Sequence, residues 1–144
     1  TNSHFFVWDP GAGKIVFDHV LNNAHELGAI AAVNGHAYFV TGDQLMDYDS
    51  HARALKPIYH FDHPRSVPLE SLQAAKDGTL WGILGGELAH IFPARREVHF
   101  FPETQGKATS GLTIGADGTI YFGSHTQVWI HHPKSPSPPV SFGQ

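Results

Sequence analysis

Three stretches of the chain share one pattern of apolar and polar positions. In each, a turn that ends in glycine is followed by an alternating run rich in β-branched and aromatic residues. The turns are Asn34-Gly35, Asp77-Gly78 and Asp117-Gly118. Such pairs predict primed hairpin turns, because glycine adopts positive φ freely and Asn and Asp tolerate it. Each stretch is therefore expected to form a β-hairpin.

The three hairpins recur at a nearly constant spacing, since their glycines lie 43 and 40 residues apart. Further alternating runs follow each hairpin, and the chain begins with two more runs that match the third and fourth strands of the repeat. A period of about 40 residues is typical of propeller blades, which have four strands each. The repeat therefore predicts an all-β, β-propeller-like fold.

The predicted propeller has about three and a half four-stranded antiparallel blades. Closed propellers have about four to eight blades, so we expect this chain to be part of a larger or oligomeric propeller. A small β-sandwich or barrel is the alternative. Prolines near the end of the chain leave the fourth strand of the last blade in doubt, because proline cannot donate to a sheet ladder. The expected boundaries are a partial blade at 1–23, blades at 28–61, 69–101 and 110–132, and a Pro/Ser-rich tail at 133–144.

The opening run FFVWDPGAGKIVF and the later run DGTIYFG resemble bacterial propeller repeats of the VWDPxxGK and DGxIYxG type. Carbohydrate-active, PQQ-like and NHL-like propellers contain such repeats, and the resemblance covers nearly the whole chain. It implies the fold and says little of function, because enzymes, lectins and scaffolds share these repeats. Pro93 and His132 stand where Asp9 and Asp49 would predict an acid, which leaves open whether the last two outer turns keep the same geometry.

The amino-acid composition excludes several kinds of function. The 144 residues have a formal net charge of −4, with only nine Lys and Arg, which argues against a nucleic-acid surface. No run is long and apolar enough to predict a membrane span. The absence of cysteine excludes disulfides, thiolate ligands and a thiol nucleophile. It leaves the compartment open, with a secreted or periplasmic location slightly favoured.

Candidate chemistry follows from the expected loop arrangement. Calling the strands of a blade A to D, the B–C and D–A loops share one face, where propellers tend to bind ligands by fold-level analogy. Histidines are abundant, twelve in all, and most are expected to make local contacts between strands. On the candidate face we expect catalytic roles for His63, Arg65 and His125, and ligand-binding roles for His25, Asp43, Glu87 and Lys107.

Two chemistries fit such a face. Imidazoles could hold a divalent metal with Asp43 or Glu87 as an oxygen ligand, although no histidine pair has a strong metal-ligand spacing. Alternatively, a histidine base could act beside Arg65, which would neutralise the carboxylate of a uronate, as in propeller polysaccharide lyases. For the aromatic residues, packing between blades is favoured over stacking on sugars. The sequence identifies no cofactor or metal.

The expected function is that of a ligand-binding propeller segment, related to carbohydrate, with its site on the D–A and B–C loops. The first alternative is the C-terminal part of a propeller polysaccharide lyase that acts on a uronate-containing glycan, so the question of enzyme activity stays open. The second is a protein-interaction scaffold. The expected partners are a carbohydrate or other small ligand, and either further copies or missing blades from another segment.

Overall fold

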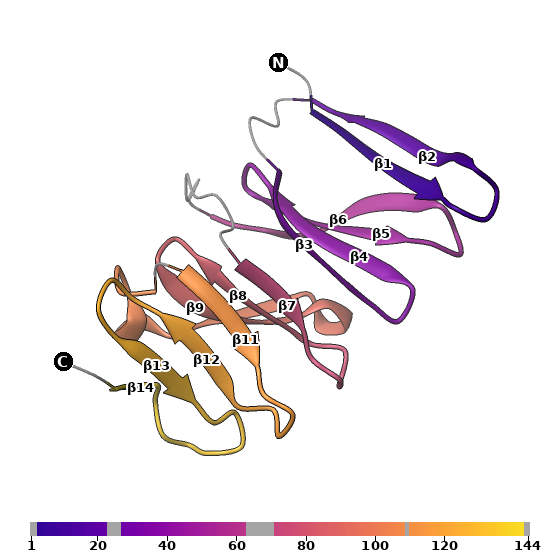
Figure 1. The fold of residues 1–144 in the computed structure, drawn as a ribbon. Helices are drawn as coiled ribbons and strands as arrows, with labels where there is room; N and C mark the ends of the chain where they lie inside the picture. The colour runs from indigo at the N-terminus through magenta and orange to yellow at the C-terminus, as the bar shows by residue number, and fades with distance from the viewer. Residues whose placement is uncertain (1–2, 23–26, 63–70, 109, 143–144) are drawn as a thin grey trace.

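The computed structural model describes residues 3–22, 27–62, 71–108 and 110–142. Its strands form four antiparallel sheets, in which each strand pairs with its neighbours in the sequence. Figure 1 shows the sheets following one another from the N-terminus to the C-terminus. The predicted all-β, propeller-type architecture is confirmed, with one two-stranded and three four-stranded sheets.

Each sheet is named here as a blade. Blade 1 contains β1 (Ser3–Asp9) and β2 (Lys14–Leu21), and blade 2 contains β3 (Leu27–Val33), β4 (His36–Thr41), β5 (Gln44–Asp49) and β6 (Ala54–His60). Blade 3 contains β7 (Ser71–Ala74), β8 (Leu80–Leu84), β9 (Glu87–Phe92) and β10 (Glu97–Phe100). Blade 4 contains β11 (Ser110–Ile114), β12 (Ile120–Gly123), β13 (Val128–His131) and β14 (Val140–Phe142). Two 3-10 turns, η1 (Pro93–Arg95) and η2 (Pro102–Thr104), complete the elements. Within the described chain, no helix could cross a membrane.

The blades pack face to face, and the burial pattern follows from this. The strands β3, β7 and β11 contact one another in series, as expected of the A strands. A separate hydrophobic cluster fills each space between neighbouring blades. All five residues of β8 are buried, because blade 3 is covered on both faces. Its near-continuous apolar run is what a strand covered on both sides requires.

The inner hairpins differ in their turns. Asn34 and Gly35 both have positive φ (53° and 80°), which gives the predicted primed turn. The prediction is wrong for the other two: in the Asp77-Gly78 and Asp117-Gly118 turns, glycine alone has positive φ. In blade 3, the amide of Gly78 donates to the carbonyl of Ala75 at 3.1 Å. These two turns are thus type I turns followed by a left-handed glycine, a three-residue loop.

A side-chain contact explains the difference. The Asp77 carboxylate accepts hydrogen bonds from the backbone amide and the hydroxyl of Thr79, at 3.0 and 2.7 Å. Asp117 accepts the same two bonds from Thr119, at 3.0 and 2.8 Å. A carboxylate bound two residues ahead favours an Asx turn. The first hairpin has histidine at the position of the threonine.

The turns between the last two strands of blades 1 to 3 show how Pro93 affects the geometry of this connection. Asp9 and Asp49 each accept two backbone hydrogen bonds from the turn that follows, at 2.8 to 3.1 Å. Strand register aligns them with Phe92, one residue before Pro93. The third turn keeps the left-handed residue at its end, Arg96, but η1 replaces the aspartate cap. The same loop length is therefore held by a proline turn instead of a carboxylate.

The end of the chain continues the last sheet. Residues 132–139 form a long loop, after which β14 pairs with β13. All three residues of β14 are exposed. The doubtful fourth strand of the last blade is thus present, as a short exposed edge.

Candidate functional site

Three of the predicted site residues, His25, His63 and Arg65, lie outside the described residues. The proposed lyase pair of His63 and Arg65 therefore stays a prediction from the sequence. Of the remaining four, Asp43 and His125 lie in B–C connections and Lys107 lies in a D–A connection, whereas Glu87 is the first residue of β9.

Asp43 lies in the tight turn between β4 and β5. Its main-chain carbonyl accepts a hydrogen bond from the amide of Phe61 at 2.8 Å, which fixes the turn against the end of β6. Its carboxylate lies 3.5 Å from Nε2 of His60. The side chain stays partly exposed and lines a pocket, so it is available to a ligand.

The other three described candidates have different surroundings. Glu87, the first residue of β9, is only 4% exposed, so a ligand on the loop face has little access to it. The Lys107 ammonium donates to the main-chain carbonyl of Glu103 at 3.1 Å and lies 5.4 Å from the ring centre of Trp129. His125 is exposed in the loop between β12 and β13. Within the described ranges, no group of three or more His, Asp or Glu residues is placed to hold a metal ion.

The pocket beside Asp43, called here the Asp43 pocket, has a volume of about 370 Å³. It lies between blades 1 and 2, where the D–A connection and the B–C turn meet. Its polar lining combines carboxylate, amide, hydroxyl and imidazole groups from His19, Asn22, Thr41, Asp43 and Gln44. These groups can donate and accept several hydrogen bonds to one ligand.

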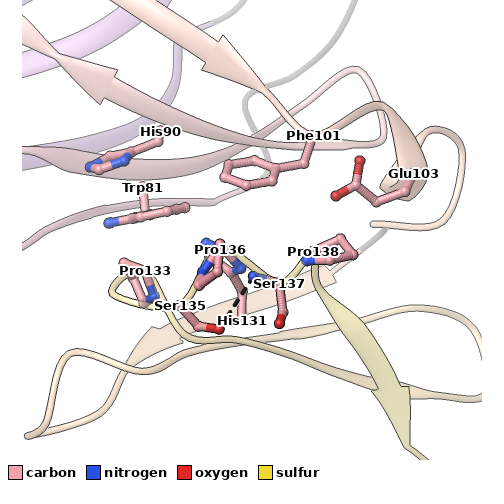
Figure 2. A pocket seen from close by; sticks show the side chains of 10 residues that line it. All are labelled: Trp81, His90, Phe101, Glu103, His131, Pro133, Ser135, Pro136, Ser137 and Pro138. Carbon is pink, nitrogen blue, oxygen red and sulfur yellow. Dashed lines mark hydrogen bonds between the residues drawn. The ribbon is translucent and has the colours of Figure 1, made fainter.

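A second cavity, called here the His131 cavity, lies between blade 3 and the 132–139 loop of blade 4. Its volume is about 290 Å³. Figure 2 shows Trp81, His90 and Phe101 on one side and the proline-rich loop on the other, with His131 beside the loop. The indole of Trp81 is stacked on the imidazole of His90, with ring centres 3.8 Å apart.

Burial keeps both histidines of this cavity neutral. Loss of solvation lowers the pKa of His90 to about 4, and the charge of Asp77 opposes this only in part. Burial also lowers the pKa of His131, against the attraction of the Glu103 carboxylate. Among the described residues, Nδ1 of His131 and Nε1 of Trp129 are buried without a hydrogen-bond partner.

Sequence reasoning did not identify the His131 cavity as a site. It expected His131 and His132 to point to opposite sides of a strand. His131, the last residue of β13, is buried, and His132, the residue after the strand, is exposed. It also favoured core packing for the tryptophans, and Trp81 and Trp129 are buried, whereas Trp8 is 54% exposed. The cavity joins residues about 50 positions apart, and no local motif signals that meeting.

Several histidines make the local contacts expected of them. His36 lies 2.7 Å from the buried carboxylate of Asp47, and His4 lies 3.2 Å from the exposed carboxylate of Asp18. The Thr79 hydroxyl donates to Asp77, so it accepts a hydrogen bond from Nε2–H of His90 at 2.9 Å. In the strand register, His36 of blade 2 corresponds to Thr79 of blade 3, and Asp47 of blade 2 corresponds to His90 of blade 3. The same cross-strand position is therefore polar in both blades.

Comparisons with solved structures agree with the fold. The extracellular domain described as part of a hybrid two-component system from B. thetaiotaomicron is similar over 96% of this chain, with 18% identity and a TM-score of 0.69. Virginiamycin B lyase from Staphylococcus aureus is similar over 92% of this chain, with 17% identity and a TM-score of 0.70.

The chain spans 21% of the first of these proteins and 46% of the second. No protein-family model matches the sequence, and no curated protein matches it. At such low identity the likeness concerns the fold alone: the chain has a β-propeller-type fold, and the sheets formed by its described residues do not close into a ring.

Proposed function

We propose that this chain is a ligand-binding segment of a β-propeller and that it binds a carbohydrate in the Asp43 pocket. The observation that carries the proposal is the polar lining of that pocket, on the face where the D–A and B–C connections meet. A volume of about 370 Å³ lies in the range of small-molecule sites. Sugar hydroxyls both donate and accept, which matches a wall of carboxylate, amide and hydroxyl groups.

The charge of the pocket favours a neutral sugar. Asp43 contributes a carboxylate, and the described lining includes no lysine or arginine that would pair with a uronate. A uronate placed here would meet like charge, which costs affinity. A neutral glycan would instead gain charge-assisted hydrogen bonds from its hydroxyls to Asp43.

The test is a calorimetric titration of the chain with neutral oligosaccharides and with uronate-containing ones. We expect a neutral glycan to bind and Asp43→Asn to weaken that binding about 10-fold or more, the usual effect of losing a hydrogen bond to a charged group. Asp18→Asn is the matched control, because Asp18 is an exposed aspartate on β2 that does not line the pocket.

Failure of every neutral glycan to bind would refute the proposal, and so would equal effects of the two substitutions. Cleavage of a uronate glycan with an unsaturated product would support the lyase alternative instead. Capture of a protein partner without any glycan binding would support the scaffold alternative.

A further inference from the structure

The His131 cavity lies apart from the Asp43 pocket and shares no lining residue with it. Its walls are mainly rings: the indole of Trp81, the phenyl of Phe101, two imidazoles and three prolines. Figure 2 shows these rings on both sides of the cavity. A site with flat apolar faces on opposite sides fits a flat ligand.

The wall formed by blade 3 is held in place by ring stacking and hydrogen bonding. Trp81 is stacked on His90, and its ring centre lies 5.8 Å from that of Phe101 and 5.4 Å from that of His131. The hydrogen bond to Thr79 sets the orientation of the His90 ring. Trp81 is only 2% exposed, because the rings of His90, Phe101 and His131 cover it, so the accessible part of this wall is formed by the half-buried Phe101 and His90.

The opposite wall is held by hydrogen bonds within the loop. The Thr119 hydroxyl donates to Asp117, so it accepts a hydrogen bond from Nδ1–H of His132 at 3.1 Å. The carbonyl of His132 accepts from the amide of Ser135 at 2.8 Å, and the hydroxyl oxygen of Ser135 accepts from the amide of Ser137 at 3.2 Å. Three prolines restrict the remaining backbone. Both walls are thus preformed, which reduces the entropic cost of binding.

The charge at the cavity is negative. Glu103 carries the one formal charge among the described lining residues, because burial keeps His90 and His131 neutral. Lys107 is bonded to the main-chain carbonyl of Glu103. An anionic ligand would meet an acid and neutral imidazoles. A cationic ligand would meet a carboxylate and the π faces of aromatic rings.

We propose that the His131 cavity binds a small flat aromatic molecule that carries a protonated amine. The ring packs between Phe101 and His90 on one side and the loop prolines on the other, and the ammonium group faces Glu103. The volume of about 290 Å³ suits a ligand of one or two rings, near the lower limit of small-molecule sites. This site is separate from the proposed carbohydrate site.

The test compares tryptamine with indole-3-acetate, which share a ring system and differ in charge. Binding is followed by the aromatic NMR signals of Trp81, His90 and His131. We expect tryptamine to shift these signals and to bind at least about five-fold more tightly than indole-3-acetate. Glu103→Gln should weaken tryptamine binding about two- to five-fold, the range for a solvent-exposed charge pair.

Glu97→Gln is the control, since Glu97 is an exposed glutamate of blade 3 that does not line the cavity. It should leave both affinities unchanged. Equal affinities for the two indoles would overturn the proposal, as would equal effects of the two substitutions. Shifts that avoid Trp81, His90 and His131 would overturn it as well.

Discussion

The imidazole of His90 lies nearly parallel to the indole of Trp81, with ring centres 3.8 Å apart and ring planes inclined by 15°. Its Nε2–H donates to the hydroxyl oxygen of Thr79, the residue before the neighbouring strand β8. A neutral imidazole satisfies both contacts. Protonation would place a charge in a partly buried position, which is why burial lowers the pKa of His90 to about 4.

The free energy of unfolding should fall as the pH falls from about 6.5 to about 4. In the unfolded chain His90 has an ordinary pKa, so the unfolded state takes up the proton first and is favoured by acid. The contribution is present in full above pH 6.5 and is lost by about pH 4. We expect a loss of order 1–2 kcal/mol, after allowance for solvent screening.

The measurement is thermal unfolding across this range for the native chain and for His90→Phe, which keeps a ring beside Trp81 and removes the titrating group. In His90→Phe, the free energy of unfolding should fall less steeply with falling pH than in the native chain. His131 should account for part of the remaining fall, since burial also lowers its pKa. The aspartates of the turns have pKa values below 3.8, so their contributions are lost at lower pH. An unchanged slope in His90→Phe would contradict the prediction.

A buried threonine connects the D–A loop of blade 3 to its B–C hairpin. Thr104 is fully buried. Its hydroxyl accepts a hydrogen bond from the amide of Leu88 at 2.9 Å, and the same O–H donates to the carbonyl of Phe101 at 2.7 Å. Thr104→Val should cost about 1–3 kcal/mol, because it leaves the Leu88 amide buried without a partner. Thr104→Ser should cost only about 1 kcal/mol, the loss of one buried methyl group.

Urea unfolding of the two variants measures this difference. Serine is the matched control because it keeps the hydroxyl and changes only the apolar part of the side chain. If valine is tolerated as well as serine, the hydrogen bonds of Thr104 contribute little to stability.

The sequence predicted the number and order of the blades because the turn signal is local and repeats. It did not predict the turn types, which depend on a side chain two residues away: Asp77 has Thr79 as a donor, whereas Asn34 has His36 at that position. The placement of Asp43 on a loop face was also predictable, since strand order alone decides it. The pocket beside it was not, because His19 reaches it from another blade.

Two adjacent loops of blade 3 meet at glycines. Gly86 has a φ of +74°, and a Cβ there would lie 3.3 Å from Cα of Gly106. Gly86→Ala should therefore be destabilising by two effects, left-handed backbone strain of about 1 kcal/mol and displacement of the D–A loop. Gly42→Ala is the control, because Gly42 has a φ of +56° and nothing lies within 4 Å of its Cβ position.

Thermal unfolding of the two alanine variants separates the effects. Gly86→Ala should lower the melting temperature by several degrees more than Gly42→Ala. Equal losses would show that strain alone accounts for the glycine and that the D–A loop moves aside at little cost.

The blades at both ends of the described structure, blades 1 and 4, expose apolar side chains. Phe6 and Trp8 on the outer face of blade 1 are 57% and 54% exposed, and Phe142 of blade 4 is 57% exposed. The paired residues Tyr121 and Ile130 of blade 4 occupy the same register positions as Trp81 and His90 of blade 3, whose side chains face blade 4. These outer faces thus have the residues of a blade-packing surface, and exposed surfaces of this kind promote association.

We therefore expect the isolated chain to self-associate in solution, with a mass that rises with concentration in light scattering. Trp8→Lys should lower the association by placing a charge on the outer face of blade 1, without changing the unfolding midpoint of the dissociated chain. Ser50→Lys adds the same charge in an exposed turn of blade 2 and should leave association unchanged. If the native chain stays monomeric at high concentration, these apolar faces are stable in water, and no further blades are needed to cover them.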